Sequence, residues 1–165
     1  MTMLELPHTA GCLVCGPANA HGLHLSLHVD PATGVVETRF VPAEHHIGFI
    51  GIVHGGVIGA VLDEAMVWAA SWQGKRFCVC GEMSVRFRQS ARIGSPVIVR
   101  AKVDLSRAKL IATSSEASDE SGKIIATGTG KYVPLSVEDN RAFVRTFVDN
   151  PATAAAAQIL RSAAN

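Results

Sequence analysis

Residues 55–72 form the stretch that most constrains what this chain can fold into. Their apolar side chains point in nearly every direction around a helix: Val57, Ile58, Val61, Leu62, Ala65, Met66, Trp68, Ala69 and Trp72. A helix that is apolar on nearly every side is stable only where other elements shield it from water. The apolar runs of the chain are nevertheless interrupted well short of the length that crosses a bilayer. The sequence therefore predicts one central helix inside a globular domain.

Strand-like patterns stand on both sides of this helix. Before it, Leu23, Leu25, Leu27 and Val29 alternate with polar residues, and the turn residues 30–34 lead into a second strand at residues 35–41, so we expect a hairpin. Residues 43–53, rich in His and Gly, are expected to be an irregular loop. After the helix, turn signals separate four further strands, which we expect to form an antiparallel meander: residues 77–87, 96–105, 110–117 and 124–133.

The predicted class is α+β, with a curved antiparallel sheet of about six strands wrapped around one central helix. With 165 residues the chain fits one domain. We place an N-terminal segment with a Cys-x2-Cys turn at residues 1–22, the domain at residues 23–134, and a C-terminal helix with an Ala-rich tail at residues 135–165. The tail is expected to be a docked or frayed surface segment.

Charge and the N-terminal residues narrow the classes of partner. The formal net charge is +1, which gives no strong basic field for binding nucleic acid or membranes, so we expect neither as a partner. Residues 1–7 contain Glu5 and no apolar run of the kind found in signal peptides. The sequence predicts a soluble, cytoplasmic protein.

The four cysteines do not form the dense framework of a small secreted domain, and reduced thiols are expected. Cys12 and Cys15, with His21 and His24 nearby, have part of the spacing of a zinc site. A closed zinc site takes four ligands, and no second compact pair of Cys or His follows. We therefore expect structural cysteines in a tight turn and no metal.

Asp63 and the glycines before the helix are the candidates for chemistry. Asp63 lies more than two turns inside an otherwise apolar helix, where an ionised carboxylate without a partner is costly. Gly55 and Gly56 open the helix, so a ligand can approach exposed N–H groups at the positive end of the helix dipole. The neighbouring Glu64 is expected to be a solvated side chain without a role in the chemistry.

The distance between these groups implies a second subunit. Asp63 follows Gly55 by eight residues, which is roughly 12 Å along a helix. One helix cannot bring both groups to one carbonyl. If both act on the same substrate, the Gly55 N–H must come from a partner helix running in the opposite sense. We therefore predict an obligate homodimer with two composite sites, with a tetramer as a dimer of dimers left open.

The order of elements and the run His54-Gly55-Gly56, followed after six residues by Asp63, resemble the hotdog-fold thioesterases of the 4-hydroxybenzoyl-CoA thioesterase superfamily, most closely its PaaI-type branch. The resemblance extends from about Cys12 to Val133. It includes three further runs: Cys12-x2-Cys15-Gly16 with Asn19 and Gly22-Leu23, residues 51–56 (Gly-Ile-Val-His-Gly-Gly), and residues 85–88 (Val-Arg-Phe-Arg).

The resemblance implies an acyl-CoA thioesterase that uses no cofactor, because coenzyme A is part of the substrate. It implies that Asp63 is the nucleophile or the general base, that the Gly55 N–H polarises the thioester carbonyl, and that His54 shapes the helix start. The chain also departs from the family. His45 and His46 stand where an Asn or Gln is common, and Val67, Trp68 and Ala69 stand where a Ser or Thr is common.

Further residues are candidates for substrate binding. Gly56 and His46 lie near the helix start, although a loop histidine is more often simply solvated. Arg86 and Arg88 share one face of a strand and suit the phosphates of coenzyme A, or else form an exposed or subunit-contacting face. The acyl group stays open. Two other functions also stay open: a hotdog protein that binds acyl-CoA without cleaving it, and an enoyl-thioester hydratase.

Overall fold

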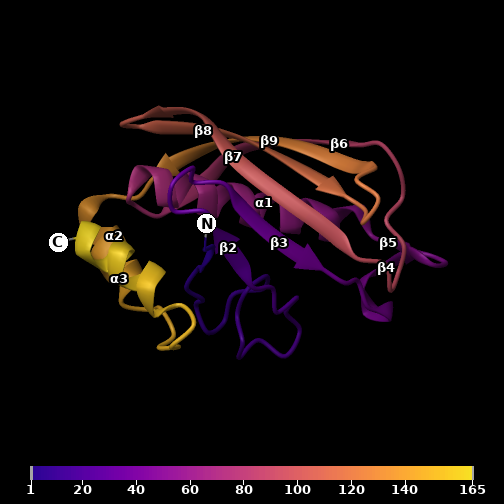
Figure 1. Ribbon diagram of the computed structural model, residues 1–165, viewed down its shortest axis with the longest axis horizontal. Helices are drawn as coiled ribbons and strands as arrows, with labels where there is room; N and C mark the ends of the chain where they lie inside the picture. Colours follow the sequence, from indigo (N-terminus) through magenta and orange to yellow (C-terminus); the bar gives the residue numbers. More distant parts are fainter. Residues whose placement is uncertain (1, 165) are drawn as a thin grey trace.

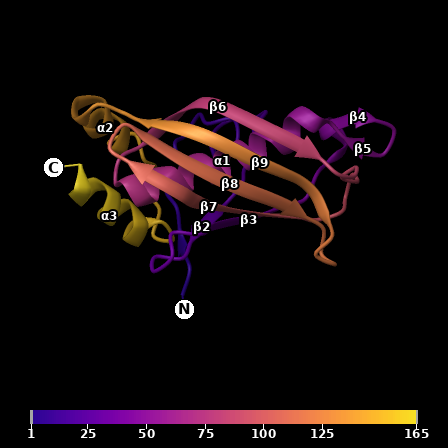
Figure 2. The same ribbon diagram turned by 90° about the horizontal axis from the view of Figure 1, so that it is seen from above.

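A seven-stranded antiparallel sheet forms the body of the protein in a computed structural model that describes residues 2–164. Met1 and Asn165, the outer ends of the two predicted terminal segments, lie outside the described residues. The order across the sheet is β1-β2-β3-β7-β8-β9-β6. Figure 2 shows this order from β2 to β6. The strands are β1 (Leu4–Glu5), β2 (Leu27–Val29), β3 (Val36–Phe40), β6 (Cys78–Phe87), β7 (Val97–Arg107), β8 (Leu110–Ser118) and β9 (Ile124–Pro134).

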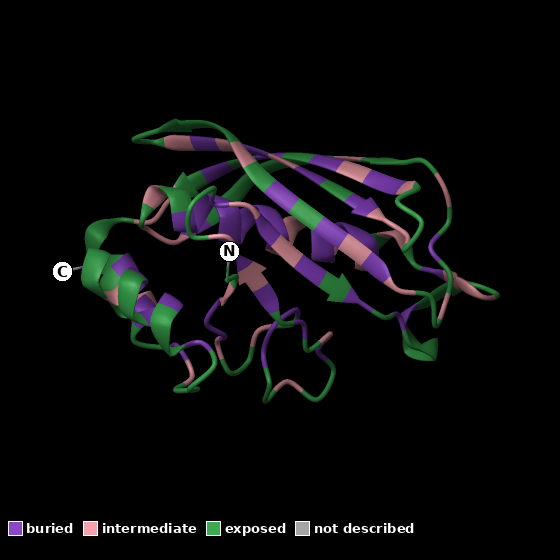
Figure 3. Cartoon of the chain, in the orientation of Figure 1, coloured by how far each residue is buried: buried purple, intermediate pink, exposed green. Residues whose placement is uncertain are grey.

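The central helix α1 (Gly55–Gly74) is buried between this sheet and the N-terminal segment (Figure 1). Val61, Leu62, Ala65 and Met66 have no exposed surface, and Figure 3 shows burial along most of the helix. On β9, a side chain at Gly128 would lie 3.2 Å from the end of Met66, so the glycine lets the helix pack closely on the sheet. The predicted α+β class and the enclosed helix are confirmed.

The sheet order corrects the predicted four-strand meander. β7, β8 and β9 pair in sequence, but β6 pairs with β9 and not with β7, whose other neighbour is β3. The chain leaves β3, crosses the sheet through α1 and returns at the far edge, which leaves room for β7 beside β3. β6 is consequently an edge strand. The two-residue strand β1, which the sequence analysis did not include, pairs with β2 at the other edge.

Two segments before the helix also differ from the predicted elements. The first strand begins at Leu27, because His24 has a left-handed backbone (φ 52°) and the N–H groups of Leu23 and Leu25 bond to Leu13 and Val14. Residues 43–53 are more regular than expected. They form a 3₁₀ helix, η1 (Glu44–His46), and a small two-stranded sheet, β4 (Ile47–Phe49) and β5 (Ile52–Val53).

The C-terminal part forms two helices, α2 (Val137–Val144) and α3 (Ala154–Ala163), at the end of the molecule opposite β4 and β5 (Figure 1). The Phe143 ring stacks on Phe77 with centroids 3.7 Å apart, and the Asn140 side chain accepts the Phe77 N–H at 2.8 Å. The predicted short helix is therefore present, and most of the Ala-rich tail is helical and docked. Within residues 2–164, no helix has both the length and the apolar character needed to cross a membrane.

Candidate active site

A tyrosine on the sheet positions the carboxylate of Asp63. The hydroxyl of Tyr132, on β9, donates to Asp63 Oδ1 at 2.6 Å. The carboxylate is half-buried, whereas Tyr132 is fully buried, so its ring fixes where the hydroxyl points. Burial, together with the bond to Asp63, raises the pKa of Tyr132, which keeps the hydroxyl a donor. Asp63 is thus a positioned carboxylate that can accept a proton or attack a carbonyl carbon.

Tyr132 is a candidate site residue that the sequence did not predict. It is the only tyrosine of the chain, and it follows Gly128 and Gly130 in a strand. A side chain at Gly130 would come within 2.5 Å of the Tyr132 ring, so this glycine makes room for the ring. A lone tyrosine beside strand glycines was the available signal. It could not be used, because nothing in the sequence places β9 against Asp63.

Replacing Tyr132 with Phe is expected to lower the rate of the reaction at Asp63 by about 10- to 100-fold, because the carboxylate loses its charge-assisted hydrogen bond and its fixed position. The measurement is kcat against pH for the wild type and the variant. If the rate and its pH profile are those of the wild type, Tyr132 has only a packing role.

The two glycines at the start of α1 differ in what their backbone N–H groups bind. His54 caps the helix, and its Nδ1 accepts the N–H of Gly56 at 2.9 Å. The Gly56 N–H therefore donates to His54, and the predicted contact of Gly56 with a substrate stays a prediction. Within residues 2–164 the N–H of Gly55 has no acceptor. At the positive end of a 20-residue helix, it is the group best placed to stabilise a developing negative charge.

A cavity of about 330 Å³ opens beside Gly55. Ile58, Phe87, Arg88 and Gln89 are among the residues that line it. Arg88 therefore lies near the start of α1, and its predicted contact with a phosphate stays a prediction. Arg86 and Arg88 are both exposed, and neither forms an ion pair within residues 2–164. Both guanidinium groups are available to an anionic ligand.

Asp63 does not line this cavity, as the helix geometry requires. α1 runs from Gly55 to Gly74 as one regular helix, so eight residues separate the two groups by roughly 12 Å. A single chain therefore presents a carboxylate without an amide donor beside it, and an amide donor without a carboxylate.

His46, predicted to contact substrate, is buried and not solvated. Its Nδ1 accepts the N–H of Ala43 at 2.9 Å, and its ring packs on Phe40. Its backbone oxygen accepts the N–H of His54, so it supports the loop that leads to α1. Burial, and then the neighbouring His45, lower the pKa of His46 below its ordinary 6.5. The ring is thus held neutral by the fold.

This depressed pKa predicts a loss of stability in mild acid. A histidine that is harder to protonate when folded contributes stability above pH 6.5, which is lost as the pH falls through the folded pKa. The unfolding free energy is expected to fall between about pH 7 and pH 5, and less steeply in His46→Asn, whose Oδ1 replaces the Nδ1 acceptor without titrating. Urea unfolding against pH measures this. The control is His21→Asn, which changes an exposed histidine and is expected to follow the wild type, and identical slopes for all three proteins would refute this prediction.

Glu64 does not take the solvated role expected of it. The indole N–H of Trp68 donates to its Oε1 at 3.0 Å, and the Cys12 thiol lies 3.9 Å from the same oxygen. Burial is the main cause that raises the pKa of Glu64 to about 7. The correction has a physical reason: the N-terminal segment packs over this side of α1 and covers it.

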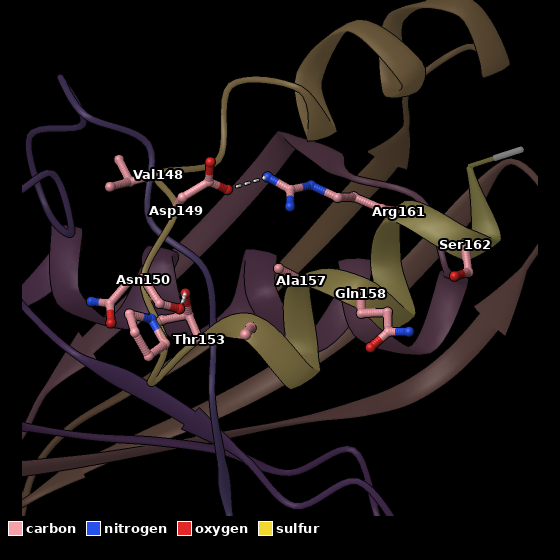
Figure 4. Close-up of a pocket in the computed structure, with 10 residues that line it drawn as sticks. Val148, Asp149, Asn150, Thr153, Ala157, Gln158, Arg161 and Ser162 are labelled. Atoms are coloured by element: carbon pink, nitrogen blue, oxygen red, sulfur yellow. Dashed lines mark hydrogen bonds and ion pairs between the residues drawn. The ribbon is translucent and has the colours of Figure 1, made fainter.

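A second, larger cavity lies away from these groups. It measures about 470 Å³ and opens between residues 148–153 and α3, where Arg161 pairs with Asp149 at 3.3 Å (Figure 4). None of the predicted site residues lines it, and it belongs to the end of the molecule that carries α2 and α3 (Figure 1). We therefore place the candidate site at α1 and not in this cavity.

One family profile matches the part of the chain that contains these groups. The sequence profile described as the thioesterase superfamily matches residues 50–126, which include His54, Gly55, Gly56 and Asp63. Residues 50–126 are therefore similar to the thioesterase superfamily. No curated protein sequence matches the chain. The predicted resemblance is confirmed at the level of this superfamily and its hotdog fold.

Solved structures of the thioesterase superfamily share the fold. One superfamily protein is 23% identical with a TM-score of 0.69, over 75% of this chain, which spans 60% of that protein's length. The Escherichia coli PaaI protein from the phenylacetic acid degradation operon is 18% identical, with a TM-score of 0.64 over 69% of this chain and 81% of that one. A Streptococcus mutans protein bound to acetyl-CoA is 14% identical, with a TM-score of 0.60 over 63% of this chain and 83% of that one.

Proposed function

We propose that this protein is an acyl-CoA thioesterase whose active site combines Asp63 of one subunit with the start of α1 of another. The observation that carries the proposal is the positioned carboxylate of Asp63 on the central helix, in the part of the chain that matches the thioesterase superfamily. It is joined by an amide donor at Gly55 that has no acceptor within residues 2–164. The acetyl-CoA bound by the Streptococcus mutans protein of the same fold supports a coenzyme A thioester as the substrate class.

The edge strand β6 is the surface we propose for the dimer. Its N–H and C=O groups on the outer side are unpaired by any other strand of residues 2–164, and such an edge readily pairs with a second copy. Large apolar side chains are exposed along it and on the nearby turn between β4 and β5: Val79 (48%), Met83 (38%), Phe87 (53%), Phe49 (79%) and Ile50 (96%). Burial of this surface in a dimer would stabilise the pair of subunits.

The placement of β6 explains how such a dimer completes the site. Its C-terminal residue Phe87 lies against Gly55, 3.2 Å from where a Cβ would stand. Nearer its start, Cys80 is the register partner of Tyr132 and lies beside Asp63. When two copies of β6 pair in opposite directions about a two-fold axis, the end of one strand meets the start of the other. This brings Gly55 of one copy toward Asp63 of the other.

In the proposed reaction, the thioester carbonyl oxygen accepts the N–H of Gly55, and Asp63 either attacks the carbonyl carbon or takes a proton from an attacking water. The C–S bond breaks, coenzyme A leaves as its thiol, and water supplies the oxygen of the free acid. Arg86 and Arg88 are proposed to contact the phosphates of coenzyme A. The reaction needs no cofactor. The cytoplasmic location predicted from the sequence stays a prediction.

Release of free thiol from a panel of short, medium and aryl acyl-CoA thioesters tests the proposal. Wild-type protein is expected to release thiol from at least one of these substrates, and the Asp63→Ala variant from none above background. Tight binding of acyl-CoA by the wild type without thiol release would show a binding protein instead. Loss of the enoyl absorption from an enoyl-CoA would show a hydratase.

A further inference from the structure

The Cys12-x2-Cys15 turn meets the half-buried side chain of Glu64 on the side of α1 that faces the N-terminal segment. One ligand atom from each of Cys12, Cys15 and Glu64 can be chosen so that all three lie within 4.8 Å of one another. These residues are 49 or more positions apart along the chain from turn to helix, so the fold and not local sequence brings them together. The sequence shows Cys12 and Cys15 with part of the spacing of a zinc site and favours a structural turn, and the structure places Glu64 beside them.

We propose that Cys12, Cys15 and Glu64 bind a zinc ion. Two thiolates and a carboxylate are ligands that zinc accepts, and water completes a tetrahedral set. Zn–S and Zn–O bonds of about 2.3 and 2.1 Å at a tetrahedral angle place the sulfur about 3.6 Å from the oxygen. Cys12 Sγ lies 3.9 Å from Glu64 Oε1, so little movement is needed. Each thiol loses its proton to solvent when the ion binds.

The backbone of the cysteine turn is arranged to stabilise a negatively charged sulfur at Cys12. The N–H groups of Val14 and Cys15 point at Cys12 Sγ, at 3.3 and 3.5 Å, which suits a sulfur that carries negative charge. A side chain at Gly16 would lie 2.4 Å from the backbone N and O of Cys12, so the turn closes only with glycine there. Backbone bonds from Leu23 to Leu13 and from Leu25 to Val14 hold the turn in place.

The surroundings of Glu64 also suit a metal ligand. The Trp68 indole N–H at 3.0 Å orients the carboxylate, as a hydrogen-bond partner of a metal ligand does. Within residues 2–164 no Lys or Arg forms an ion pair with Glu64, so no cationic side chain balances these three acidic groups. A zinc ion would offset two of their three negative charges and would tie the N-terminal segment to α1.

Metal analysis of the full chain tests the proposal with zinc and cobalt ions as probes. After incubation with Zn²⁺ and desalting, the wild type is expected to hold about one zinc ion per chain. Glu64→Gln is expected to bind it at least about 100-fold more weakly, because even losing a hydrogen-bond partner of a ligand costs about 10- to 100-fold. Cys12→Ser is expected to lose the ion. The matched control is Cys80→Ser, which changes an exposed cysteine outside the cluster and is expected to keep it.

Co²⁺ gives a second readout on the wild-type protein, so the result does not depend on whether a variant folds. Thiolate-to-cobalt absorption appears only when sulfur binds the ion. Removal of the ion by a chelator is expected to lower the melting temperature of the wild type and not of Glu64→Gln. The proposal is overturned if reduced wild-type protein takes up no zinc and shows no such absorption. It is also overturned if uptake is the same in Glu64→Gln, or if Cys12 and Cys15 form a disulfide whose reduction restores no metal binding.

Discussion

The Asp63→Asn variant is expected to hydrolyse its acyl-CoA substrate about a thousandfold more slowly than the wild type. Asparagine keeps an oxygen that accepts the Tyr132 hydroxyl, so the helix and its packing are retained, but it is neither a base nor a carboxylate nucleophile. The measurement is kcat from thiol release, with circular dichroism to confirm the fold.

A suitable control is Asp104→Asn, which changes an exposed aspartate on β7 and is expected to keep the wild-type rate. A kcat for Asp63→Asn within about threefold of the wild type would contradict the role of Asp63, because loss of an acid–base group costs about 10²-fold or more.

The second large effect is expected for Gly55→Pro, with a loss of about 100- to 1000-fold in kcat, the usual cost of removing one donor to a developing oxyanion. Proline lacks the N–H but suits the first position of a helix, and His54 before it has the extended backbone (φ −61°, ψ 131°) that proline requires.

The matched variant is Gly55→Ala, which keeps the N–H. Its Cβ would meet only the end of the exposed Phe87 ring, at 3.2 Å, so the loss expected is much smaller. Equal losses in the two variants would mean that Gly55 acts through its small size and not through its N–H. Both are compared with the wild type by kcat and KM for the same thioester.

The enclosed helix could be predicted from the sequence because nearly every position of residues 55–72 is apolar, and that pattern has one physical solution. The order of the strands could not be predicted in the same way. Pairing of β6 with β9 and of β7 with β3 follows from the path of α1 across the sheet, which local patterns do not encode. The hairpin from β2 to β3 could be predicted, because the turn residues that specify it lie directly between its two strands.

The site was predictable only in part, for a similar reason. Asp63 stood out because a carboxylate inside an apolar helix needs a partner. The partner, Tyr132, comes from a strand that lies 69 positions further along the chain. The side chains of Asp63 and Glu64 point in directions about 100° apart around the helix. The sequence therefore does not determine which of them faces β9 and which faces Cys12. That choice depends on how the N-terminal segment packs.

The composite site is tested most directly by mixed dimers of Asp63→Asn and Gly55→Pro chains, purified through two different affinity tags. Each mixed dimer would carry one site with both defects and one site with neither, so about half of the wild-type rate is expected to return. Mixed dimers that stay as slow as the two parent variants would show that Asp63 and Gly55 do not act together across the subunit interface.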